Sequence, residues 1–310
     1  MSSVKIFAGS GSKDLALKIS EFYGKPLGKS SSKKFSDGEL SFYFEESVRG
    51  CDVFLIQSTC RSSDNIMELL LMIDAARRAS ASYVTVVVPY FGYARQDRKD
   101  KPRVSIAAKM MANILTSAGA NRLMTCDLHA GQIQGFFDIP VDHLDGSAIL
   151  VPYIKSLKLE KLLFATPDVG GTARARSYAK FFEADMVVCD KHRKRANEIA
   201  SMQVIGDVTD ADVVLVDDIV DTAGTICKAA DLLKEKGANS VRAVCTHGVL
   251  SGNAIKNVEN SALEELIITD SIPQPNPIGK IKVLTVADLF AKAIRKIHDH
   301  ESISSLFINN

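Results

Sequence analysis

The sequence predicts an α/β fold made of two similar halves, each a mostly parallel sheet flanked by helices. Apolar runs rich in β-branched residues alternate with stretches of helical period along all 310 residues, which is the pattern of βαβ units. A similar Gly-Ala-Asn turn, with a helix stop before it and a strand after it, occurs at 117–124 and at 235–242. This repetition is expected of two related halves.

Each expected element rests on its own local pattern. The expected strands are short apolar runs, at 4–8, 53–57, 84–88, 122–126, 162–166, 186–189, 213–216, 241–245, 266–269 and 282–285. The expected helices lie between them, at 15–23, 65–80, 106–118, 174–182, 226–236 and 286–298. We expect residues 1–147 to form one half and 148–299 the other, with the tail 300–310 packing on the first half.

The composition excludes several classes of protein. A net charge of +1 argues against binding to nucleic acid or to a membrane surface, because such proteins carry a basic excess. The six cysteines are scattered without a Cys-x-x-Cys pair, which indicates buried thiols in a reducing compartment. We find no signal peptide and no apolar run of membrane-spanning length, so we expect a cytoplasmic protein.

The most informative segment is 213–227. Its apolar run ends at Asp217 and Asp218, and Asp221 follows. A turn of small residues then opens an expected helix, with Thr222, Ala223, Gly224 and Thr225. A helix N-terminus suits a phosphate, and carboxylates can accept hydrogen bonds from sugar hydroxyls or share a magnesium ion. The segment predicts a sugar-phosphate site, and a plain N-terminal cap on a solvated turn is the alternative.

A second turn suited to phosphate follows the expected strand 162–166. It reads Asp168, Val169, Gly170 and Gly171. Paired glycines let backbone N–H groups approach an oxyanion, and the Asp168 carboxylate could hold magnesium beside them. A simple turn explains the glycines as well, but two phosphate sites in one half suit a substrate that bears a diphosphate.

Two basic segments stand out in this nearly neutral chain. The segment 190–195 contains Lys191 and Arg193, which would neutralise charge on transferring phosphates, and a solvated charged loop is the alternative. The segment 93–103 mixes Arg, Lys, Asp and Pro without periodicity. It predicts a mobile surface loop that closes over the site.

Two further segments leave function and structure equally open. His129 follows the strand 122–126, at the sheet edge where open α/β folds bind ligands, although a single histidine is more often structural. Phe35, Asp37 and Glu39 lie in an irregular region where an aromatic face beside acceptors suits a purine. A β-hairpin turn explains their Asp-Gly pair equally well. The chain has no P-loop spacing, so any ATP would bind in another way.

Together these segments closely resemble the ribose-phosphate pyrophosphokinase family, the phosphoribosyl-pyrophosphate synthetases. The resemblance covers nearly the whole chain and implies two domains of the type I phosphoribosyltransferase fold. Its motifs are Phe-Ser-Asp-Gly-Glu (35–39), Glu-Ser-Val-Arg-Gly (46–50), Tyr-Ala-Arg-Gln-Asp-Arg (93–98), Asp-Leu-His-Ala-Gly-Gln (127–132), Pro-Asp-Val-Gly-Gly (167–171) and the acidic motif (216–225).

The resemblance implies a reaction and a role for each motif. The diphosphoryl group of Mg-ATP would pass to the anomeric hydroxyl of ribose 5-phosphate, giving 5-phosphoribosyl 1-diphosphate and AMP for nucleotide biosynthesis. The ATP-binding residues would be Phe35, Asp37, Glu39, Arg95 and Gln96. The catalytic residues would be Lys191 and Arg193, and the magnesium-associated residues His129 and Asp168. Ribose 5-phosphate would bind Arg193, Asp217, Asp218, Asp221 and the turn Thr222, Ala223, Gly224 and Thr225, beside the diphosphate loop 168–171.

The resemblance also implies regulation and assembly. It suggests a homo-hexamer built from dimers, activated by inorganic phosphate and inhibited by ADP. The regulatory positions would be Ser47, Arg49, Arg103, Ser302 and Ser304. The chain departs from the family at Val169, where Ala or His is common, and at His143, which replaces a usual Asn near the regulatory surface. A base phosphoribosyltransferase and a non-catalytic regulatory subunit are the alternatives, and the intact motifs favour the enzyme.

Overall fold

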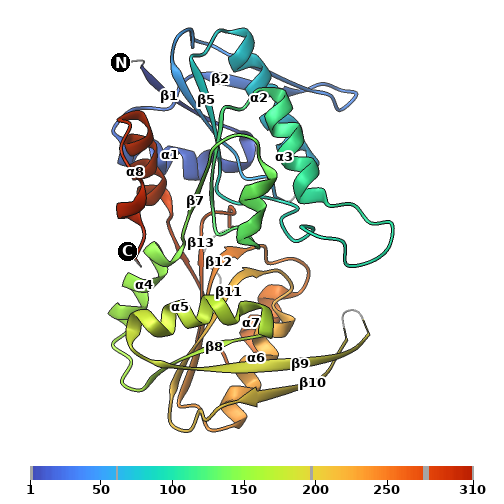
Figure 1. The fold of residues 1–310 in the computed structure, drawn as a ribbon, viewed down its shortest axis with the longest axis vertical. Helices are drawn as coiled ribbons and strands as arrows, with labels where there is room; N and C mark the ends of the chain where they lie inside the picture. Colours follow the sequence, from blue (N-terminus) through green and yellow to red (C-terminus); the bar gives the residue numbers. More distant parts are fainter. Residues whose placement is uncertain (1–2, 61, 196–197, 275–278, 309–310) are drawn as a thin grey trace.

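The computed structural model describes residues 3–60, 62–195, 198–274 and 279–308, and the side chains of 191–201 lie outside this description. Two sheets follow one another along the molecule, with the N-terminal half at the top of Figure 1 and the C-terminal half below it. Helices cover both faces of each sheet, so the predicted α/β fold is confirmed. No helix in the described ranges has the length and apolar character to cross a bilayer.

The first sheet has five parallel strands in the order β1-β4-β5-β6-β7. These strands are β1 (Val4–Ala8), β4 (Asp52–Ile56), β5 (Tyr83–Val88), β6 (Arg122–Cys126) and β7 (Val141–Leu144). One face packs against α2 (Ser63–Arg78) and α3 (Ala107–Ala118), and the other against α1 (Lys13–Tyr23). The apolar side chains of β4 alternate between these two cores, which explains why its sequence is continuously apolar.

The second sheet has seven strands in the order β10-β9-β8-β11-β12-β13-β14, of which only the β9–β10 pair is antiparallel. Its strands are β8 (Leu162–Thr166), β9 (Asp185–Arg195), β10 (Glu198–Ile205), β11 (Asp212–Val220), β12 (Ser240–Gly248), β13 (Glu265–Thr269) and β14 (Ile281–Leu284). One face carries α4 (Ser147–Ser156) and α5 (Thr172–Phe182), and the other α6 (Gly224–Glu235) and α7 (Ala254–Asn260).

The two halves share one plan. The order β1-β4-β5-β6-β7 corresponds to β8-β11-β12-β13-β14. Each half also has a hairpin after its first helix, and β9–β10 joins the second sheet whereas β2–β3 forms a sheet of its own. In each half the first strand leads through a three-residue 3₁₀ turn, η1 (Ser10–Ser12) or η3 (Val169–Gly171), into an 11-residue helix. This correspondence is the structural counterpart of the repeated turn seen in the sequence.

Several boundaries differ from the sequence prediction. The strand expected at 186–189 continues to Arg195, because it pairs with β10, and the strand expected to end at Val216 continues to Val220. The region around Phe35 is not irregular. It forms the hairpin of β2 (Ser30–Lys34) and β3 (Leu40–Phe44), and Gly38 takes a φ of 97° in its turn. The polar sequence of β2 gave no apolar signal for a strand.

The C-terminal helix α8 (Ala287–His298) packs in the core of the first half. Phe290 and Ile294 are fully buried there against α1, and Ile303 and Leu306 of the tail join the same cluster. Ile308 instead packs on the core formed by α4 and α5. The helix thus returns to the first half from the range 148–299, and the boundary at residue 147 stays a prediction.

Candidate active site between the two halves

The carboxyl ends of β6, β8 and β11 open into a cavity of about 890 Å³ between the two halves. Loops converge at this edge of a parallel sheet, which is where open α/β folds place ligands. The cavity brings together twelve of the residues predicted from the sequence: Arg95, His129, Asp168, Gly170, Gly171, Asp217, Asp218, Asp221, Thr222, Ala223, Gly224 and Thr225.

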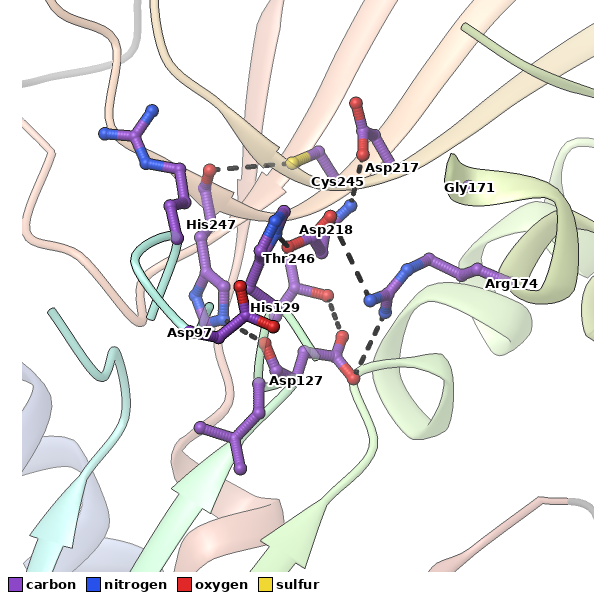
Figure 2. Close-up of polar contacts among 12 residues, drawn as sticks. Asp97, Asp127, His129, Gly171, Arg174, Asp217, Asp218, Cys245, Thr246 and His247 are labelled. Carbon is purple, nitrogen blue, oxygen red and sulfur yellow. Dashed lines mark hydrogen bonds and ion pairs between the residues drawn. The ribbon is translucent and has the colours of Figure 1, made fainter. Parts of the chain in front are cut away.

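Asp217 and Asp218 lie inside β11, so their side chains leave the strand on opposite faces. Asp218 is buried and its Oδ2 lies 2.8 Å from Nδ1 of His129, while Asp217 accepts the Asp218 N–H at 2.9 Å (Figure 2). Burial and the neighbouring Asp218 charge raise the pKa of Asp217. Burial would also raise the pKa of Asp218, but the His129 hydrogen bond and the Arg174 charge outweigh it and lower that pKa.

The same contact also changes the pKa of His129. Its hydrogen bond to Asp218 raises the pKa of the imidazole, because the carboxylate stabilises the charged form. His129 comes from the first half and Asp218 from the second. The pair therefore joins the two halves across the cavity.

A buried ion cluster continues from Asp218 to residues that sequence reasoning missed. The guanidinium of Arg174 lies 3.5 Å from Asp127 and 4.0 Å from Asp218 (Figure 2). Asp127 is buried at the end of β6 and accepts a hydrogen bond from the Thr246 hydroxyl of β12. Burial lowers the pKa of Arg174, but both carboxylates raise it and the net shift is upward. The available sequence signal was an arginine in the first turn of the helix after the 168–171 loop.

Two histidines fix the loop that carries His129. His247 is fully buried, and its Nε2 lies 3.1 Å from the carbonyl oxygens of both Cys126 and Asp127. Since carbonyls only accept, Nε2 carries the proton, and burial lowers the pKa of the ring. His143 accepts the Leu128 N–H at 2.8 Å. His143 also lines this cavity, and its expected place near a regulatory surface stays a prediction.

The predicted phosphate turns have the backbone geometry that close approach requires. A Cβ on Gly171 would lie 2.3 Å from Oγ1 of Thr166, so only glycine lets this turn pack onto β8. The Asp168 carboxylate accepts the Gly171 N–H at 3.2 Å and holds the turn. Ala223 takes a left-handed φ of 60° immediately before α6, and such strained residues cluster at ligand sites. The first turn of α6, whose N–H groups have no partner within the helix, lines the cavity.

The basic loop reaches across the same cavity. Arg95 Nη1 lies 2.8 Å from Oδ2 of Asp221, whose Oδ1 accepts the Ser251 hydroxyl. Burial raises the pKa of Asp221, but these hydrogen bonds outweigh it and the net shift is downward. Arg95 thus ties the first half to the acidic motif of the second.

Comparison with known proteins agrees with this geometry. Residues 4–119 match the N-terminal domain of ribose phosphate pyrophosphokinase, and residues 191–308 match the phosphoribosyl synthetase-associated domain. A ribose-phosphate pyrophosphokinase of Porphyromonas gingivalis is 61% identical over 303 residues, which is 97% of each chain. Another, from Campylobacter jejuni, is 54% identical over 309 residues, 99% of this chain and 100% of the relative.

The chain belongs to the ribose-phosphate pyrophosphokinase family. A crystal structure of phosphoribosylpyrophosphate synthetase from Mycobacterium smegmatis matches it with a TM-score of 0.92 at 36% identity, covering 96% of this chain and 99% of that one. The predicted family is confirmed. The protein is an enzyme of this pyrophosphokinase class.

Some predicted residues of the enzyme lie away from the main cavity. Gln96 lines a neighbouring cavity of about 310 Å³, which also contains Arg95. Phe35 is 55% exposed at the β2–β3 turn. Val169 is 61% exposed, and Lys191 and Arg193 lie on β9 with side chains outside the described residues. Neither cavity is lined by Phe35, Asp37, Glu39, Val169 or the predicted regulatory residues Ser47, Arg49, Arg103, Ser302 and Ser304.

The predicted magnesium residues fit an ion that arrives with the nucleotide. The described part of the chain contains no group of three or more His, Cys, Asp or Glu side chains placed to bind a metal. Magnesium prefers oxygen ligands and keeps waters and substrate phosphates, so one or two carboxylates suffice. The Asp168 carboxylate suits this role. The His129 imidazole suits it less well, because magnesium prefers oxygen to nitrogen ligands. Its Nδ1 is bonded to Asp218, so Nε2 is the atom that could face an ion.

Proposed function

We propose that the 890 Å³ cavity is where the enzyme transfers the diphosphoryl group of Mg-ATP to the anomeric hydroxyl of ribose 5-phosphate. The hydroxyl oxygen bonds to the β-phosphorus and releases its proton to solvent, while the bond from the β-phosphorus to the oxygen that bridges it to the α-phosphorus breaks and that oxygen leaves on AMP. The observation that carries the proposal is the convergence of a helix start, a glycine turn and acidic side chains on one cavity. Diphosphoryl transfer requires mainly positioning and charge neutralisation from the protein.

The ribose 5-phosphate end of the site is the acidic motif. The 5-phosphate would bind at the N-terminus of α6, at Thr222, Ala223, Gly224 and Thr225, where N–H groups and the helix dipole favour an anion. Asp217 and Asp221 would accept hydrogen bonds from the ribose hydroxyls. Asp218 was predicted in the same group, but it is buried and paired with His129. We therefore assign it to positioning His129.

The ATP end would run between the two cavities. Arg95 lines both of them and Gln96 lines the smaller one, so the nucleotide would lie across Arg95 with its phosphates toward the larger cavity. The diphosphate loop 168–171 would receive the transferred group, and Lys191 and Arg193 would neutralise its charge. Magnesium bound to the ATP phosphates would sit beside Asp168 and His129.

The hairpin residues Phe35, Asp37 and Glu39 support the expected assembly into a homo-oligomer. They line neither cavity of their own chain. If they contact ATP, the contact comes from another copy, which supports a homo-oligomer such as the expected hexamer built from dimers. Inorganic phosphate would act at the exposed positions Ser47, Arg49, Arg103, Ser302 and Ser304. The six cysteines are buried, which suits a reducing cytoplasm.

The test is a product analysis. The purified protein is incubated with ribose 5-phosphate, ATP and magnesium, and phosphorus NMR follows the products with and without added phosphate. We expect AMP and a sugar diphosphate to appear together, and neither to appear without ribose 5-phosphate. A lack of turnover in both phosphate conditions would refute the proposal, and AMP formation without the sugar diphosphate would indicate ATP hydrolysis instead.

A further inference from the structure

The two halves share one plan, but the loops that correspond to the substrate loops differ between them. In the second half, the loops after β8 and β11 line the 890 Å³ cavity. By the shared strand order, their counterparts in the first half follow β1 and β4. These counterparts are residues 9–12 and 57–60.

In the first half these two loops are bonded to each other. The Gly11 N–H donates to Oε1 of Gln57 at 3.1 Å, and the Ser58 N–H donates to Oγ of Ser12 at 2.8 Å. A Cβ on Gly9 would lie 2.4 Å from Cδ of Gln57, and a Cβ on Gly11 would lie 2.7 Å from Nδ2 of Asn65. The loops are therefore in close contact at Gly9 and Gly11, while Ser10, Gly11 and Cys60 also line a cavity of about 420 Å³.

The Glu68 side chain of α2 is hydrogen-bonded to both loops. Glu68 is 2% exposed. Its Oε2 accepts hydrogen bonds from the Ser10 N–H at 2.9 Å, the Ser10 hydroxyl at 2.6 Å and Nε2 of Gln57 at 2.8 Å. An N–H, a hydroxyl and an amide converging on one anionic oxygen are the donors with which a turn binds an oxyanion. Here the anion is part of the chain.

We propose that Glu68 is a built-in anion, whose carboxylate fills the oxyanion position of the first half and excludes phosphate and other small oxyanions from it. Each chain then keeps one ribose-phosphate site, in the second half. The closed loops also support the contact between halves, because the Ser58 hydroxyl donates to the Ser271 carbonyl at 2.6 Å. The count of ribose-phosphate sites rests on the proposed function, whereas the binding of Glu68 to the two loops does not.

The test is chemical rescue of Glu68→Ala. Beyond its Cβ, a glutamate side chain has the composition of acetate, so acetate can replace what the substitution removes. We expect Glu68→Ala to lower the Tm by about 5 °C or more, because three donors lose a charged acceptor. Acetate should then raise the Tm of Glu68→Ala saturably, at matched ionic strength, while acetamide of the same shape should not.

Wild type and Asp74→Ala serve as controls, since Asp74 lies on the same helix with an exposed side chain paired to Arg78. An equal acetate response in all three proteins would overturn the proposal, as would rescue by acetamide as strong as by acetate. If Glu68→Ala does not fold, Glu68→Gln tests the proposal instead, because glutamine keeps the size of the side chain but removes its negative charge. Glu68→Gln should lower the Tm without any acetate response, and a wild-type Tm for it would show that no anion is needed.

Discussion

Replacing Arg174 with methionine removes the cation between two buried carboxylates while keeping a long apolar side chain. The guanidinium lies 3.5 Å from Asp127 and 4.0 Å from Asp218. At an effective dielectric constant of about 20, each pair attracts by about 4 kcal/mol before desolvation is counted. Much of this attraction offsets the cost of burying the charges. Breaking such a cluster from one side typically costs about 3–5 kcal/mol.

We expect the lower end of that range for Arg174→Met, because each carboxylate keeps one partner. Asp127 retains the Thr246 hydroxyl and Asp218 retains His129. A loss of about 3 kcal/mol corresponds to a fall in Tm of about 6–12 °C. Turnover should also fall, since Asp218 and His129 lose part of the support that places them at the cavity.

The assay is urea unfolding with kcat measured on the same preparations. Arg176→Met is the matched control, because Arg176 is exposed two residues further along α5. The double variant Asp127→Asn with Arg174→Met should be less destabilised than the sum of the two single variants, since the pair interaction is lost only once. Equal stabilities for the Arg174 and Arg176 variants, or strict additivity with Asp127→Asn, would refute the reasoning.

Three further predictions concern the proposed roles. Lys191→Ala should lower kcat by about 10²–10³ while ATP binding largely survives, because its interaction forms mainly in the transition state. Weaker ATP binding at normal kcat would contradict that role. Asp221→Asn should weaken ribose 5-phosphate binding by about tenfold in calorimetry, the loss of about one charged hydrogen bond, and an unchanged affinity would remove Asp221 from the ribose site. The folded-state pKa of His129 is raised, so its contribution to stability is complete below its unfolded pKa of about 6.5 and is lost as the pH rises through the folded pKa. Unfolding measured from acidic to alkaline pH should therefore show wild type losing stability relative to His129→Gln, and parallel pH profiles would count against the pair.

Long apolar elements were predictable because their signal is local. Four of the five strands of the first sheet, β1, β4, β5 and β6, agree with the prediction to within one residue at each end, and α3 was expected one residue early. The hairpin β2–β3, the strands β7 and β10 and the helices α4 and α7 were not predicted. β2 is polar, and β10 pairs with β9 at the edge of the second sheet, so neither has the continuous apolar run of a buried strand. β3 does carry apolar residues, and Phe42 and Phe44 pack on the first core.

The candidate site was predictable only in part. The motifs around Asp168 and Asp221 carry their chemistry in a few consecutive residues, and both line the cavity. Arg174 had no such context, since an arginine in a helix is usually solvated. Its function as the link between Asp127 and Asp218 depends on the meeting of two sheets.

The sequence by itself determined the alternating α/β pattern, the two halves and the family, because hydrophobic period and turn chemistry are local properties of the chain. The tertiary structure alone decided that Asp127 bonds to Thr246, 119 residues away, and that Glu68 bonds to Ser10, 58 residues before it. Such contacts satisfy buried polar groups whose partners are set by how distant strands pack. No local pattern records which partner a buried carboxylate will find.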